Sequence, residues 1–173
     1  DCDDNRIFLP NENGDGFASS LALKPGHCAL SMLFSDWNRD GVPDLRISND
    51  MQFYRSGEEQ LVQLTPAGPK LYGREEGWQK INIWGMGIAA HDVTGDGYPE
   101  YYLTNITDNR FEVLEKGAAR PHYRDKAKAF NVVAGRPFAG GDLRPSTGWH
   151  AEFGDVNNDG LADLLVVKGK VEV

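Results

Sequence analysis

Apolar and polar residues alternate along several short stretches of the chain, and these stretches come in pairs. A period of two is typical of a β-strand with one buried face. We therefore predict three strands before, and three after, a set of polar loops, each with its apolar positions in the core. These positions are Leu30, Met32 and Phe34, Met86, Ile88 and Ala90, and Trp149, Ala151 and Phe153 before the loops, and Leu45 and Ile47, Tyr101 and Leu103, and Leu164 and Val166 after them.

The polar loop between the strands of each pair follows one motif. Residues 36–44, 92–100 and 155–163 all match D-x-[N/T]-x-D-G-x-x-[D/E] without gaps. The first Asp residues of the three loops lie 56 and then 63 positions apart. A spacing of this size indicates an array of repeated supersecondary units.

The segments between these units carry weaker signals for outer hairpins. Residues 6–9 precede a turn-rich segment, residues 52–55 and 61–65 flank a turn, and residues 110–114 precede another turn. Two inner strands and an outer hairpin make the four strands of a propeller blade. We thus predict an all-β fold, a partial β-propeller of four-stranded antiparallel blades with the acidic loops between the inner strands. The predicted blades are residues 28–83 and 84–147, between the end of a blade at 1–27 and the start of one at 148–173.

The three loops have the chemistry of calcium sites. Positions 1, 3, 5 and 9 carry oxygen side chains, position 6 is Gly, and position 7 offers a backbone carbonyl. Hard oxygen ligands in this number suit Ca²⁺ better than zinc or copper. We predict up to three structural Ca²⁺ ions, held by Asp36, Asn38, Asp40, Val42 and Asp44, by Asp92, Thr94, Asp96, Tyr98 and Glu100, and by Asp155, Asn157, Asp159, Leu161 and Asp163.

The motif differs from that of an EF-hand, and the three loops also differ from one another. An EF-hand needs a Glu at position 12 and flanking helices, whereas this position is Ile47, Leu103 or Val166 within strand patterns. The second loop departs from the motif at Thr94 and Glu100, so we expect it to be the weakest site. Arg39 brings a positive charge to the first loop and is expected to lower its affinity.

The net charge of the chain fits this interpretation and excludes some partners. Its 26 Asp and Glu against 18 Lys and Arg give a formal charge of −8, which disfavours nucleic acid as a partner. Nine of those 26 acidic residues lie in the loops, and three Ca²⁺ ions would bring the charge to about −2.

We expect no membrane insertion, because the sequence lacks an apolar stretch of about 18 residues. We also expect no signal peptide in this stretch, since its first four residues are Asp-Cys-Asp-Asp.

Cys2 and Cys28 are the two cysteines of the chain. Their number and spacing exclude a Cys-rich zinc site and a CxxC redox motif. Two interpretations stay open from the residues alone, a disulfide from the N-terminus to the strand near residue 28 or two unrelated buried thiols.

The three loops resemble those of FG-GAP/VCBS repeats, the calcium-binding blades of integrin-α-like β-propellers. The runs at 84–90 and 146–154 are similar to those of cartilage acidic protein-like (ASPIC-type) secreted proteins. The resemblance covers nearly all of the chain. It implies a secreted, extracellular or cell-surface setting (periplasmic if bacterial), a role in cell adhesion, scaffolding or display, and an extracellular protein or glycan ligand. That setting favours the Cys2–Cys28 disulfide.

Other candidate residues carry less information. The GxGxxA match at 85–90 lacks the helix that a dinucleotide site needs, so we expect its glycines to permit close strand packing. Trp149 is expected in the core because it shares a repeat position with Leu30 and Met86. Asn105 begins a glycosylation sequon, relevant only in a eukaryotic secretory pathway. Catalytic motifs are not found, and His91 and His150 are more typical of strand or surface histidines.

The sequence favours a non-enzymatic extracellular module in which calcium is structural. Two alternatives stay open. One is the propeller of an extracellular hydrolase or lyase, which would need a polar cluster at the central axis. The other is an assembly subunit whose partial blades are completed by neighbouring blades or by another chain, because open sheet edges invite pairing.

Overall fold

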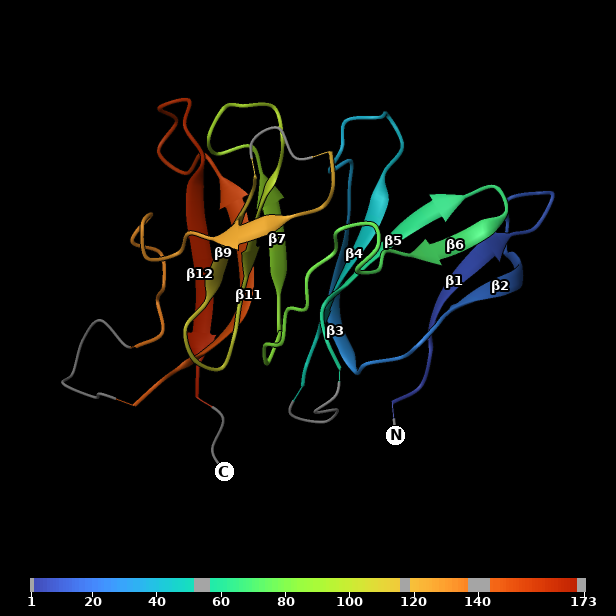
Figure 1. Cartoon of the computed structure of the whole chain (residues 1–173), viewed down its shortest axis with the longest axis horizontal. Coiled ribbons are helices and arrows are strands. Elements are labelled where there is room, and N and C mark those ends of the chain that lie inside the picture. Colours follow the sequence, from blue (N-terminus) through green and yellow to red (C-terminus); the bar gives the residue numbers. More distant parts are fainter. Residues whose placement is uncertain (1, 52–56, 116–118, 137–143, 171–173) are drawn as a thin grey trace.

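The computed structural model describes residues 2–51, 57–115, 119–136 and 144–170, and these form an all-β fold without helices. All strand pairs are antiparallel, in four sheets. The sheets follow one another in chain order along the length of the molecule (Figure 1).

The first and last sheets have two strands each, and the two between them have four. The first sheet pairs β1 (Asn5–Pro10) with β2 (Phe17–Leu23), and the last pairs β11 (Thr147–Gly154) with β12 (Asp163–Gly169). The second sheet has the order β3 (Ala29–Ser35), β4 (Asp44–Asn49), β5 (Gln60–Thr65), β6 (Gly68–Leu71). The third has the order β7 (Ile88–His91), β8 (Glu100–Leu103), β9 (Arg110–Leu114), β10 (Tyr123–Asp125).

Each predicted pair of inner strands is present. The pairs β3–β4, β7–β8 and β11–β12 flank the three acidic loops, with Phe34 opposite Leu45, Ala90 opposite Tyr101 and Phe153 opposite Leu164. The first strands of these pairs lie next to one another, since β7 contacts both β3 and β11. The alternation of apolar residues therefore predicted these six strands correctly.

One outer hairpin lies later in the chain than predicted. Strand β5 pairs with β4 on one side and with β6 on the other, so the hairpin of the second sheet is β5–β6. The turn at Pro66-Ala67 links these strands, and Gly68 after it adopts a φ of 121°, which favours glycine. The predicted strand at 52–55 lies outside the described residues.

Three apolar clusters join the sheets face to face. Leu23, Leu45, Ile47 and Val62 join the first sheet to the second. A larger cluster around Trp78, Leu61, Ile88 and Tyr101 joins the second to the third. Tyr102, Phe111 and Ala151, with Leu164 and Val166 beside them, join the third to the fourth. Each four-stranded sheet is thus covered on both faces, at least in part.

Gly85 and Gly87, just before β7, permit this close packing. A Cβ on Gly85 would lie 2.2 Å from Ser48 Oγ of β4, and one on Gly87 would lie 2.8 Å from the carbonyl oxygen of Trp149 in β11. Any larger residue would push the neighbouring strands apart. The GxGxxA segment is therefore a packing feature between sheets, as its strand context predicted.

The predicted burial is wrong at four apolar positions. Leu30, Met32 and Phe34 of β3 are 52%, 48% and 60% exposed, because β1–β2 covers only part of this face of the second sheet. Trp149 is 42% exposed and is not a core residue. The register of β11 shifts between Gly148 and His150, and this bulge places the indole against Gly169.

The second and third sheets also share a buried ion pair. Arg46 of β4 donates from Nη2 to Glu112 of β9, and both side chains are almost completely buried. The guanidinium carbon lies 4.4 Å from the ring centroid of Tyr101, and the rings of Trp78 and Tyr123 enclose it further. Cation–π contacts of this kind stabilise a desolvated guanidinium.

Candidate calcium loops

Backbone geometry is the same at two positions of all three loops. Position 4, which is Arg39, Gly95 or Asn158, adopts a φ between 59° and 70°. Position 6, which is Gly in each loop, adopts a φ between 82° and 90°. This left-handed conformation is costly for most residues and free for glycine, so it accounts for the Gly of the motif. The three segments are therefore one local structure used three times.

The first carboxylate holds the backbone of each loop. One oxygen of Asp36, Asp92 or Asp155 accepts a hydrogen bond from the amide of position 5, at 3.0–3.1 Å. The other oxygen accepts from the amide of the Gly at position 6, at 2.8–2.9 Å. The carboxylate of position 5 in turn accepts from the amide of position 7. These bonds fold each loop back on its first residue.

The carboxamides at position 3 adopt matching positions in the first and third loops. In both, the Asn Oδ1 accepts from the amide of position 5, and Nδ2 donates to the carboxylate of position 5 at 2.9 Å. Val42 and Leu161 at position 7 have exposed side chains, 49% and 71%, so they offer the site only their backbone. The role of the position 7 carbonyl as a ligand stays a prediction.

The last carboxylate of each loop lies at the start of the second strand. Asp44 and Glu100 are buried, and Asp163 is partly buried. Burial, and then the nearby carboxylates of Asp40 and Asp36, raise the pKa of Asp44 to about 6. Burial also raises the pKa of Glu100, although hydrogen bonds from Thr94 and Val93 act in the opposite direction. Among the described residues, no cationic side chain forms an ion pair with either group, and a bound cation would supply that opposite charge.

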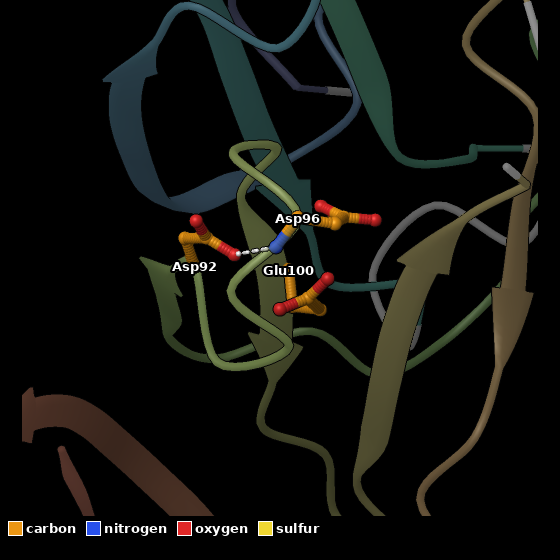
Figure 2. Close-up of side chains that lie close together, drawn as sticks. All are labelled: Asp92, Asp96 and Glu100. Atoms are coloured by element: carbon orange, nitrogen blue, oxygen red, sulfur yellow. Dashed lines mark hydrogen bonds between the residues drawn. The ribbon is translucent and has the colours of Figure 1, made fainter. Parts of the chain in front are cut away.

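The second loop brings its three acidic residues closest together. Ligand oxygens of Asp92, Asp96 and Glu100 all lie within 4.8 Å of one another, the one such group of three among the described residues (Figure 2). Glu100 reaches the backbone amides of Val93 and Thr94 at 2.7 and 3.0 Å and the Thr94 hydroxyl at 3.1 Å. Glu100 thus bonds directly to the position 3 residue, Thr94, through both its amide and its hydroxyl. The weaker affinity that we expected for this loop stays a prediction.

A recess lies beside the first and second loops. It has a volume of about 540 Å³ and is lined by the aromatic rings of Trp37, Tyr72 and Tyr98 together with Glu75 and Arg120. Trp37 and Tyr98 belong to the loops themselves, at position 2 of the first and position 7 of the second. The sequence pattern did not predict this recess, because its residues outside the loops come from the segment after β6 and from the segment before β10.

The structure also places the two cysteines, the sequon residue Asn105 and the two histidines singled out in the sequence. A disulfide joins Cys2 to Cys28, with the two Cα atoms 5.1 Å apart. Asn105 is buried, and its side chain bonds to Trp84, Ile106, Thr107 and Asp108. The folded chain therefore does not present this amide as a glycan acceptor. His91 stacks on Phe153, and His150 is exposed on β11.

Searches against protein-family models, curated proteins and solved structures gave no match to the chain. Within the described part of the chain, no helix is long and apolar enough to cross a membrane. The assignment of a function therefore depends on the three loops and on the sheets that carry them.

Proposed function

We propose that this chain is an extracellular calcium-binding segment of a β-propeller, and that it acts as an adhesion, scaffold or ligand-binding module. In this proposal calcium is structural and the module is not an enzyme. The observation that carries the proposal is the threefold recurrence of one loop geometry with oxygen side chains at the same positions.

The order of the sheets supports the propeller. A blade has four antiparallel strands that follow one another from the axis outwards. The second and third sheets have this order, and the first strands of neighbouring sheets touch one another. In this arrangement β3, β7 and β11 are the innermost strands, and β1–β2 is an outer hairpin of a preceding blade. The FG-GAP/VCBS resemblance of the loops implies the same architecture.

The loop chemistry supports calcium as the ion. Each loop offers three carboxylates and a carbonyl, with a further amide or hydroxyl oxygen at position 3. Ca²⁺ accepts six to eight such oxygens in a flexible geometry. Without a cation, the carboxylates of one loop repel one another, and the buried ones pay a desolvation cost. A bound ion removes both penalties, so it should stabilise the folded chain.

The proposed extracellular setting is consistent with calcium sites that are weak and structural. The Cys2–Cys28 disulfide is compatible with an oxidising compartment. Extracellular modules bind calcium with Kd values of about 10⁻⁴–10⁻³ M, which match the supply outside cells. The recess beside the first two loops is the position that we favour for a ligand, because calcium would fix the loops that form two of its walls.

Thermal unfolding tests the calcium proposal. We expect the melting temperature to rise with calcium and to fall with a chelator at fixed ionic strength, with magnesium as the matched control ion. At ten times Kd each bound ion stabilises the fold by about 1.4 kcal/mol. Glu12→Ala, an exposed carboxylate outside the loops, should leave this response unchanged. An identical melting temperature in calcium and in chelator would contradict the proposal.

A further inference from the structure

Arg39 belongs to the first loop in the sequence, but its side chain lies against the second loop. A Cβ placed on Gly97 would overlap Nη1 of Arg39 and would lie 2.9 Å from its Cζ. The guanidinium carbon also lies 5.5 Å from the ring centroid of Tyr98. Gly97 and Tyr98 are positions 6 and 7 of the second loop. The positive charge of Arg39 is therefore next to the second of the three candidate calcium loops.

The fold of the first loop determines where this side chain begins. Arg39, at position 4, adopts a φ of 60°, which is uncommon for residues other than glycine. The amide of Asp40, the next residue, donates to Oδ1 of Asp36 at 3.0 Å and to Oδ1 of Asn38 at 3.2 Å. These bonds hold the backbone at Arg39, so the base of its side chain has a defined position beside the second loop.

The loop fold itself does not require an arginine at position 4. The second loop has Gly95 there, and the third has Asn158, whose φ of 59° is almost that of Arg39. The same left-handed backbone therefore accepts a short, uncharged side chain. The long cationic side chain of the first loop is an additional feature, and its contacts are the guide to what it does.

The part of the second loop that Arg39 touches is bonded directly to the acidic side chains. Gly97 donates its amide hydrogen to Oδ2 of Asp92 at 2.8 Å. Tyr98 donates to Oδ1 of Asp96 at 3.0 Å. Oxygens of the three acidic residues of this loop lie within 4.8 Å of one another (Figure 2). The guanidinium thus contacts the two residues whose amides hold two of these three carboxylates.

We propose, on the basis of the calcium-binding function proposed above, that Arg39 lowers the calcium affinity of the second loop more than that of its own loop. In the ion-free loop, the guanidinium charge offsets part of the repulsion among the carboxylates. In the calcium-bound loop, the same charge repels the ion. Both effects favour the ion-free state. The sequence assigned this effect to the first loop because Arg39 lies within its motif, whereas both contacts of the guanidinium are with the second loop.

The effect should be moderate and should depend on salt. Arg39 is exposed, and among the described residues it forms no ion pair with a carboxylate. Its charge therefore acts on the ion through solvent, where both water and salt weaken the interaction. Because the Debye length falls from about 30 Å at 0.01 M salt to about 8 Å at 0.15 M, the effect should be largest at low salt.

A calcium titration followed by NMR measures each loop separately. Gly41, Gly97 and Gly160 each donate an amide hydrogen to the first carboxylate of their own loop, so their amide signals report one Kd per loop. Arg39→Asn introduces the residue that the third loop has at this position. We expect the Kd at Gly97 to fall by about two- to fivefold at low salt. The Kd at Gly41 should change less, and the Kd at Gly160 should stay the same.

Arg39→Lys is the matched control, because it keeps the positive charge. Its Kd at Gly97 should stay closer to the wild-type value than that of Arg39→Asn, and added salt should reduce the difference between Arg39→Asn and the wild type. An equal fall in both variants would show that the charge is not the cause and would overturn the proposal.

The same titration separates this proposal from the proposed function. An unchanged or higher Kd at Gly97 in Arg39→Asn would overturn the role of Arg39, as would a larger change at Gly41 than at Gly97. Either result would leave the proposed function intact, because the loops would still bind calcium. If none of the three glycine signals responded to calcium, both the role of Arg39 and the calcium-binding function would be contradicted.

Discussion

Charged side chains gather in two regions of this protein, the interior and the acidic loops, and the two regions differ in whether an opposite charge lies beside them. Between the second and third sheets, Arg46 is buried with its own counter-charge, Glu112, and with three aromatic rings. In the loops, nine carboxylates cluster at strand ends and no cationic side chain pairs with them in the described contacts. Arg46 and Glu112 neutralise each other within the chain, whereas under the proposed function the loop carboxylates would take their counter-charge from an ion in solution. Substitutions in the interior and substitutions in the loops should therefore differ in how their effect on stability depends on calcium.

The largest effect should come from breaking the buried pair. Arg46→Met removes the buried partner of Glu112 and leaves it only the partly exposed Arg110, whose Nε lies 3.3 Å from the other carboxylate oxygen. We expect a loss of up to about 3–5 kcal/mol. The loss should be the same in calcium and in chelator, as measured by guanidinium unfolding. Lys70→Met removes one partner of an exposed ion pair with Glu76 and should leave the midpoint nearly unchanged. If Arg46→Met lowered the free energy of unfolding only in calcium, the stability of the interior would depend on calcium, contrary to the comparison.

The next effect should come from the titration of Glu59, a second buried carboxyl near Arg46. Burial is the main cause that raises its pKa from 4.5 to about 8. The folded state therefore binds this proton more tightly than the unfolded state, and stability should fall as the pH rises from about 4.5 through about 8, by on the order of a few kcal/mol.

Glu59→Gln is the matched variant for this titration, because its amide oxygen still accepts the hydrogen bond from the Asn49 amide. Unfolding at pH 5 and at pH 8 should show a smaller decrease in the variant than in the wild type. Equal decreases would assign the pH dependence to other groups.

A smaller effect should come from single loop ligands. Asp40→Ala removes the position 5 carboxylate of the first loop, and we expect a loss of about 1.4 kcal/mol at ten times Kd, present in calcium and small in chelator. Asp159→Ala in the third loop should behave in the same way. Equal losses with and without calcium, measured by thermal unfolding, would show that these carboxylates act only through their hydrogen bonds.

The smallest effect should come from the charge next to the first loop. Arg39 at position 4 lies over the ring of Tyr98, 5.5 Å from its centroid. Arg39→Asn matches Asn158 of the third loop and removes a positive charge near the ion, so calcium affinity should rise by about two- to fivefold at low salt. Terbium luminescence titration measures this change, and an unchanged or lower affinity would remove Arg39 as the cause of a difference between the loops.

The sequence predicted the six inner strands and the three loops because a strict local pattern determines them. Alternating apolar residues specify the strands, and Gly at position 6 specifies a backbone conformation that other residues rarely adopt. The φ values of Gly41, Gly97 and Gly160 agree with this requirement. Local rules of this kind act within a few residues, so they are visible in the sequence alone.

Features that depend on contacts between distant segments were not predictable in this way. Arg46 occupies a strand position that corresponds to Tyr102 and Leu165, and nothing nearby in the sequence identifies Glu112 as its partner. The exposure of Met32 and Phe34 depends on the extent of the first sheet, not on their own alternation. The bulge at Trp149 reverses the burial expected from its repeat position. The hairpin of the second sheet was predicted across a turn between residues 55 and 61, whereas β5 and β6 pair across Pro66-Ala67.

The number of calcium ions bound per chain tests the central claim most directly. Native mass spectrometry and equilibrium dialysis at millimolar calcium should both report three ions per chain. Asp40→Ala, Asp96→Ala and Asp159→Ala should each remove one ion. Binding of no calcium at concentrations well above about 10⁻³ M, the weak limit for extracellular modules, would contradict the account.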